Sequence, residues 1–140
     1  MPKVSATACV EAYSSISVTS YNFTLLLSGD AESREISTRY ARMVSEIPRV
    51  KRVVNEVVVG PNATLSQQSH DAYVTTKAIL ALFDLDVPGF DPTRVKVLTQ
   101  KGTLFLMGLV TREEGEVVTE QVRNIDGVLR VVKVFEYIDR

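Results

Sequence analysis

The amino-acid sequence predicts an α+β fold of two similar small units, and three observations support this prediction. Residues 16–29 are echoed by residues 95–108, at an offset of 79 residues. Each copy continues into a polar stretch with helical spacing of its apolar residues. Each then ends in a valine-rich segment, residues 50–59 and 128–135, at an offset of 78. The order β-β-α-β therefore occurs twice, which indicates tandem modules.

Composition narrows the functional classes. The chain of 140 residues is 45% hydrophobic and 24% charged, as is usual for a folded protein. Its net charge is −1, and the charges are spread over both halves, so no basic half indicates nucleic-acid binding. No run approaches the roughly 18 apolar residues that span a bilayer. Residues 1–9 end in small residues and Cys9, the one cysteine, but lack the apolar stretch of a signal peptide, so Cys9 is expected to be incidental.

The first copy begins with a weakly helical segment, residues 4–14, followed by a strand in which Ile16 and Val18 alternate with polar residues. A turn at residues 21–22 leads to a second strand, which Gly29 is expected to end. Apolar residues at helical spacing predict a helix over residues 33–46, and the β-branched segment 50–59 predicts a third strand.

The second copy has an added helix, expected over residues 69–83, before its hairpin of residues 95–98 and 103–107. Thr111 and Glu114 form a capping-box pattern at the start of the next helix. That helix is expected to bury Val117, Val118 and Val122, and residues 128–138 form the last strand. One helix on a three-stranded sheet leaves further apolar area to be covered. Gly29 and Gly108 are interpreted as positions of close packing between strand and helix.

The helix over residues 69–83 is the strongest candidate for a functional surface. At about 100° per residue, one face suits packing on the sheet, and it carries Val74, Ala78, Ile79 and Leu82. The opposite face carries Tyr73, Thr76, Lys77 and Leu80, with Phe83 at its edge. Outer faces of helices are usually charged, whereas this face is largely apolar, which suits weak docking on a bilayer surface. The alternative is that its large side chains pack against the other copy.

Other polar residues have structural explanations. His70 is the only histidine and is expected to be exposed at a helix start, so no histidine-based metal site or catalytic triad is indicated. The acidic residues Glu113, Glu114 and Glu116 complement a helix dipole, and Asp84, Asp86 and Asp91 do not have the spacing of a calcium loop. The basic residues around the end of the first copy's helix are expected to form a solvated face, with contact to phosphate or lipid headgroups as the alternative: Arg39, Arg42, Arg49, Lys51 and Arg52. No catalytic residue, metal or cofactor is predicted.

Three strings carry a family resemblance: SHDAYVTTK at residues 69–77, LFLMGLVTR at 104–112 and VVKVFEYI at 131–138. With the repeat, they resemble the dual BON-domain outer-membrane lipoprotein family of Gram-negative bacteria, over about residues 16–138. The resemblance implies αββαβ modules, the first lacking most of its first helix. The expected boundaries are residues 1–60 for the first domain, 61–68 for a linker and 69–140 for the second domain.

The resemblance also implies a function. Such proteins lie at the periplasmic face of the outer membrane, concentrate at division sites, bind anionic phospholipid and support membrane integrity. The first helix of the second BON domain is the expected lipid surface, which assigns this role to Tyr73, Thr76, Lys77, Leu80 and Phe83. The alternative is a protein-protein adaptor, linked to the machinery that assembles outer-membrane barrels and using the same helix. An incomplete first domain would also expose an apolar face through which the chain could oligomerise.

Overall fold

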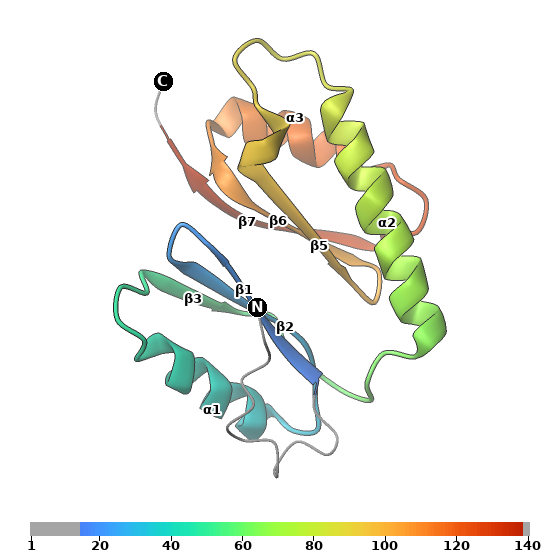
Figure 1. The fold of residues 1–140 in the computed structure, drawn as a ribbon. Helices are drawn as coiled ribbons and strands as arrows, with labels where there is room; N and C mark the ends of the chain where they lie inside the picture. The colour runs from blue at the N-terminus through green and yellow to red at the C-terminus, as the bar shows by residue number, and fades with distance from the viewer. Residues whose placement is uncertain (1–14, 139–140) are drawn as a thin grey trace. The chain divides into compact units, whose positions relative to one another are not determined.

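The structure, a computed structural model, describes residues 15–138. The chain divides into two compact units, Met1–Thr64 and Leu65–Arg140. Figure 1 shows a sheet and at least one helix in each unit. The expectations for residues 4–14, for Cys9 and for an incomplete first helix lie outside the described residues. The α+β fold class and the two small mixed sheets are confirmed.

The first unit contains strands β1 (Ser15–Tyr21) and β2 (Thr24–Ala31), helix α1 (Arg34–Ser45), and strands β3 (Arg52–Asn55) and β4 (Val58–Val59). Strand β2 pairs with β1 in antiparallel register and with β3 and β4 in parallel register. Helix α1 packs on this sheet (Figure 1). Their shared core consists of Ile16, Val18, Leu25, Leu27, Ala31, Ile36, Tyr40 and Val44.

The prediction of one continuous strand over residues 50–59 is wrong, because Asn55 interrupts it. The Asn55 Oδ1 atom accepts a hydrogen bond from the Val57 amide at 3.1 Å, and its Nδ2 atom donates to Ser37 Oγ at 2.7 Å. A side chain that bonds the backbone two residues ahead forms a turn and competes with the strand ladder. The segment therefore pairs with β2 as two short strands, β3 and β4.

The second unit contains helix α2 (Leu65–Phe83), the short 3-10 helix η2 (Pro92–Arg94), strands β5 (Val95–Gln100) and β6 (Thr103–Val110), helix α3 (Arg112–Arg123) and strand β7 (Arg130–Tyr137). Strand β6 pairs with β5 in antiparallel and with β7 in parallel register. The core joins both helices to the sheet through Val74, Ala78, Leu82, Val95, Leu104, Leu106, Val110, Val118, Val122 and Phe135. Helix α2 begins at Leu65, inside the span expected to be a linker.

The capping box at the start of α3 is confirmed. Thr111 Oγ1 accepts a hydrogen bond from the Glu114 amide at 3.1 Å, and Glu114 Oε1 accepts one from the Thr111 amide at 2.9 Å. Val118 and Val122 are fully buried as predicted, whereas Val117 is only partly buried. The helix therefore starts where its sequence indicates and presents a narrower apolar face than expected.

Gly29 and Gly108 have a different role from the one predicted. Both lie within strands, β2 and β6, so Gly29 does not end its strand. A Cβ atom at Gly29 would overlap the carbonyl oxygen of Ser15, and one at Gly108 would overlap that of Arg94. Each glycine thus permits the close approach of the antiparallel segment beside it. The interpretation as packing between strand and helix is wrong.

Candidate functional site

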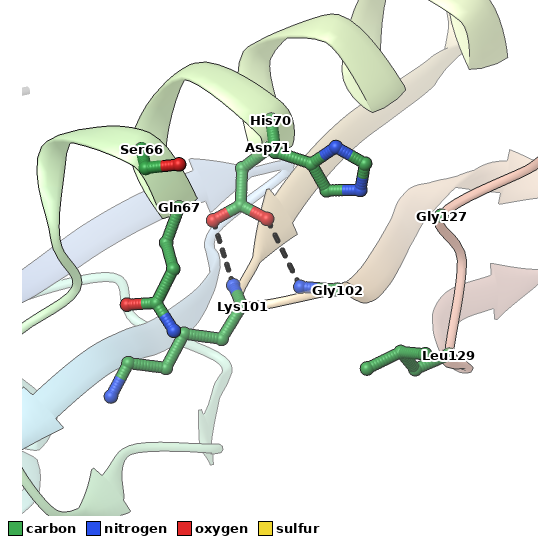
Figure 2. A pocket seen from close by; sticks show the side chains of 8 residues that line it. All are labelled: Ser66, Gln67, His70, Asp71, Lys101, Gly102, Gly127 and Leu129. Carbon is green, nitrogen blue, oxygen red and sulfur yellow. Dashed lines mark hydrogen bonds between the residues drawn. The ribbon is translucent and has the colours of Figure 1, made fainter.

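Helix α2 is held to the sheet by a buried carboxylate, which Figure 2 shows from close by. Asp71 is 6% exposed, and its two oxygens accept hydrogen bonds from the backbone amides of Lys101 (2.7 Å) and Gly102 (3.0 Å), at the tip of the β5–β6 hairpin. One turn further along the helix, the hydroxyls of Thr75 and Thr99 are 2.8 Å apart. These contacts determine which side of α2 faces the sheet. We call Asp71 and its two hydrogen bonds the Asp71 clamp.

The inward face of α2 is close to the prediction, with one correction. Val74, Ala78 and Leu82 are at most 2% exposed. Ile79, which was expected to pack with them, is 41% exposed. Its position five residues after Val74 corresponds to a rotation of about 140° around the helix axis, which carries it off the packed face. Ile79 therefore adds to the apolar surface on the outside.

The outer face of α2 carries large apolar side chains that are exposed. Tyr73 is 54% exposed, and Leu80 and Phe83 are each 59% exposed. The other two candidates, Thr76 and Lys77, are exposed as well. We define the outer face as Tyr73, Thr76, Lys77, Ile79, Leu80 and Phe83. The structure thus brings all five predicted site residues onto one side of one helix.

The polar groups of the outer face are largely satisfied within it. The hydroxyl of Thr76 donates a hydrogen bond to the Ala72 carbonyl oxygen at 3.0 Å, so it is bonded inside the helix. The Lys77 Nζ atom lies 5.5 Å from the centre of the Tyr73 ring, which is the geometry of a cation-π contact. This contact holds the ring and the ammonium group together at one edge of the face. Most of what the face offers to a partner is therefore apolar area.

A groove of about 450 Å³ runs beside the outer face. Its walls come from α2 and from the loop after α3, and its lining residues are Tyr73, Lys77, Leu80, Ala81, Asp84, Asn124, Ile125 and Asp126. Asp84 and Asp126 make this edge acidic, with Lys77 as the one basic residue in the lining. Attraction between formal charges contributes little to anion binding at such an edge, so the burial of apolar area has to dominate binding here.

A second pocket, of about 400 Å³, opens at the start of α2 and is drawn in Figure 2. It contains Ser66, Gln67, His70, Asp71, Lys101, Gly102, Gly127 and Leu129. His70 is exposed, as predicted, but it lies in the second turn of α2 rather than at its start, with its Nε2 atom beside Gly127. Both oxygens of Asp71 are used by the clamp, so its carboxylate has a structural role. Sequence reasoning missed Asp71, although its spacing of three from Val74 and seven from Ala78 matches the buried face.

Two of the remaining acidic candidates, Glu114 and Asp91, have structural contacts. Glu114 caps α3 and forms a 3.1 Å ion pair with Arg94, whose second nitrogen donates to the Leu109 carbonyl oxygen at 2.9 Å. Hydrogen bonds from the Thr93 hydroxyl and amide hold the pKa of Asp91 below its usual value. Within residues 15–138, no group of three or more histidine, cysteine or acidic side chains is arranged to hold a metal ion. Across that same range, no helix is long and apolar enough to cross a membrane.

Comparison with known proteins gives two clear similarities. The chain is 31% identical over 133 residues to the outer membrane lipoprotein DolP of Haemophilus influenzae, which covers 94% of this chain and 67% of that protein. It is 30% identical over 126 residues to a 21 kDa hemolysin of Actinobacillus pleuropneumoniae, which covers 88% of this chain and 62% of that protein. The chain therefore spans about two thirds of the length of these curated relatives.

Among solved structures, the chain is similar to the C-terminal domain of CdsD, a structural protein of the type III secretion system of Chlamydia trachomatis. The identity is 17%, the TM-score is 0.41, and the match covers 89% of this chain and 57% of that one. This level of similarity carries no inference about function. The BON domain model, in contrast, matches twice, at residues 7–61 and at residues 71–139. The chain therefore belongs to the BON domain family, with two copies of the domain in tandem.

Proposed function

We propose that this protein is a non-enzymatic phospholipid-binding protein at the periplasmic face of the outer membrane, where it supports membrane integrity. The outer face of α2 docks on anionic phospholipid. One observation carries this proposal: Tyr73, Leu80 and Phe83 are more than half exposed on a helix whose opposite side is held by the Asp71 clamp. The similarity to an outer membrane lipoprotein supports the compartment.

The geometry of α2 suits an interfacial position. Its 19 residues extend over about 28 Å, and the exposed aromatic and aliphatic side chains lie along one side of it. Tyrosine favours the membrane interface because its ring is apolar and its hydroxyl stays hydrated. A helix of this kind lies in the plane of the headgroups with its apolar side buried in the acyl region.

The exposed area predicts weak, reversible docking. A fully buried large apolar side chain contributes about 1.5–3 kcal/mol, and the exposed fraction of each large side chain of the outer face, from 41% to 59%, sets how much of this is available. Tyr73, Ile79, Leu80 and Phe83 together give roughly 3–6 kcal/mol. This corresponds to a Kd of about 0.04–6 mM, which is similar to or weaker than the binding of a single fatty acyl anchor. A second attachment to the membrane is therefore needed for stable residence.

The proposal is tested by flotation with vesicles of phosphatidylcholine, with and without phosphatidylglycerol. Tyr73→Glu removes the exposed part of the ring and adds a negative charge, together about 2–2.5 kcal/mol, so binding to the anionic vesicles should fall about 30- to 70-fold. Leu129→Glu is the control, because Leu129 is a highly exposed aliphatic side chain of the same unit outside the outer face. Undiminished binding by Tyr73→Glu would exclude the outer face as the lipid surface.

A protein-protein adaptor is the second candidate, and the acidic groove beside the outer face favours it. Asp84 and Asp126 repel anionic headgroups but complement a basic partner surface. An adaptor that uses the same face, for example with outer-membrane assembly machinery, would float with neither vesicle type. That result would replace the phospholipid proposal with this one.

A further inference from the structure

The first unit holds an aromatic ring outward on a strained turn. The β1–β2 hairpin turns at Asn22 and Phe23, whose φ angles are +49° and +66°. The second position of such a turn normally carries glycine, because a side chain at positive φ is disfavoured. Phe23 is nevertheless there, and it is 50% exposed. The ring is thus only half buried in return for the strain, which points to a role outside the fold of the unit.

The second unit provides an internal comparison. Its β5–β6 hairpin turns at Lys101 and Gly102, with φ angles of +49° and +84°, so glycine occupies the position equivalent to Phe23. The surrounding contact is the same in both units. The Lys51 amide donates to the Phe23 carbonyl oxygen at 2.8 Å, and the Leu129 amide donates to that of Gly102, also at 2.8 Å. The fold of this hairpin therefore does not require an aromatic residue at its tip.

A second apolar side chain is exposed beside Phe23. Ile47, in the loop after α1, is 45% exposed. The two residues line one largely apolar pocket of about 400 Å³, whose other residues are Ser20, Asn22, Leu25, Pro48 and Val50. The hairpin and the loop thus form one apolar surface at the end of the unit where β2 begins.

Basic residues flank this apolar surface. Residues 47–54 include Arg49, Lys51 and Arg52 and no acidic residue, and all three basic side chains are exposed. Arg52 pairs with Thr24, the residue after Phe23, and the Lys51 backbone is bonded to Phe23 itself. Two acidic residues flank the segment. Glu46 is the C-cap residue of α1 and directly precedes Ile47. Glu56 follows β3, and its amide donates to the carbonyl oxygen of Leu27, further along β2 than Phe23.

We propose that this tip, defined as Phe23, Ile47, Pro48, Arg49, Lys51 and Arg52, is a second lipid-contact site that docks on an anionic phospholipid bilayer. Phe23 and Ile47 enter the interface, and the basic side chains contact the headgroups. The apolar and basic side chains together match an anionic bilayer, because apolar side chains insert into the interface and basic side chains are attracted to anionic headgroups. A basic partner is disfavoured by charge, and an uncharged apolar partner would not use the three cations. The site does not depend on the outer face of α2.

The chain contains no tryptophan, so a single introduced tryptophan reports its own surroundings. In the full chain, Phe23→Trp should show blue-shifted emission and strong quenching with vesicles of brominated phosphatidylglycerol. Val59→Trp is the matched control, since Val59 is 48% exposed and pairs with Ala31 at the other end of β2. Its emission should change little. Equal quenching at both positions, or none at Phe23→Trp, would overturn the proposal.

A third reporter, Tyr73→Trp, separates this site from the proposed function. Quenching at Tyr73→Trp alone leaves the outer face of α2 as the lipid surface and rejects the tip. Quenching at Phe23→Trp alone supports the tip and rejects the outer face. If brominated lipid quenches the tryptophan emission of neither variant, both proposals fail.

Phe23→Gly tests the tip by removing the ring and the strain together. Flotation with anionic vesicles should weaken about four- to thirteenfold, the effect of losing the exposed half of one aromatic ring. The thermal midpoint should stay the same or rise, because glycine relaxes the turn. The double variant Arg49→Gln/Arg52→Gln should weaken binding at low salt and reduce its salt dependence. Unchanged flotation of both variants would contradict a lipid role for the tip.

Discussion

Removal of the Asp71 clamp should destabilise the second unit by an amount that follows from its two hydrogen bonds. Asp71→Ala leaves the amides of Lys101 and Gly102 without their carboxylate partner. The carboxylate is buried, because Asp71 is only 6% exposed. Hydrogen bonds to a charged acceptor contribute about 1.5–3 kcal/mol each. Water replaces part of this at the hairpin tip, so we expect a loss of about 3 kcal/mol in the free energy of unfolding.

The loss is measured by urea denaturation, followed by circular dichroism, together with amide hydrogen exchange at Lys101 and Gly102. For a unit of this size, about 3 kcal/mol lowers the thermal midpoint by roughly 12–24 °C. Asp84→Ala is the control, because Asp84 is an exposed aspartate that directly follows the same helix. A change below about 0.5 kcal/mol for Asp71→Ala, as for an ordinary surface substitution, would refute the clamp. Unaltered exchange of the Gly102 amide would refute it independently.

Two further predictions concern the second unit. Arg94→Ala leaves the buried Glu114 carboxylate without its cation and should lower the free energy of unfolding, measured by urea denaturation, by about 2–4 kcal/mol. Arg123→Ala removes an exposed ion pair with Glu120 and should lower it by less than about 0.5 kcal/mol. Equal losses of stability in these two variants would contradict the role of Arg94 as the partner of a buried carboxylate. Gly108→Ala should destabilise the β5–β6 pairing by about 3 kcal/mol or more, because its Cβ would overlap the Arg94 carbonyl oxygen, whereas Gly60→Ala meets open space. Similar thermal midpoints for these two alanine variants would contradict the close approach.

Much of the fold could be predicted because the repeat presents the same pattern twice. Strand, hairpin and helix positions depend on short-range periodicity, which the sequence displays directly. The capping box is local too, since Thr111 and Glu114 are three residues apart. The outward direction of Tyr73 and Leu80 followed from the helix period alone, and the structure agrees with it.

The features that could not be predicted depend on partners that are distant in sequence. Asp71 bonds amides 30 and 31 residues away, and Asn55 bonds Ser37, 18 residues away, so no local pattern marks either contact. The role of Gly29 depends on the carbonyl oxygen of Ser15 in the neighbouring strand β1, which no pattern around Gly29 indicates. Ile79 is a different case, because its rotation of about 140° from Val74 already indicates a position off the packed face.

The lipid-contact role of α2 is tested most directly by nuclear Overhauser effects between the protein and lipid acyl chains in anionic nanodiscs. The outer face predicts contacts from the methyl groups of Leu80 and the ring of Tyr73 to acyl methylene protons. The buried methyl groups of Val74 and Leu82 should show none. Contacts of Tyr73 and Leu80 with water alone, in nanodiscs that retain the protein, would contradict lipid docking through this helix.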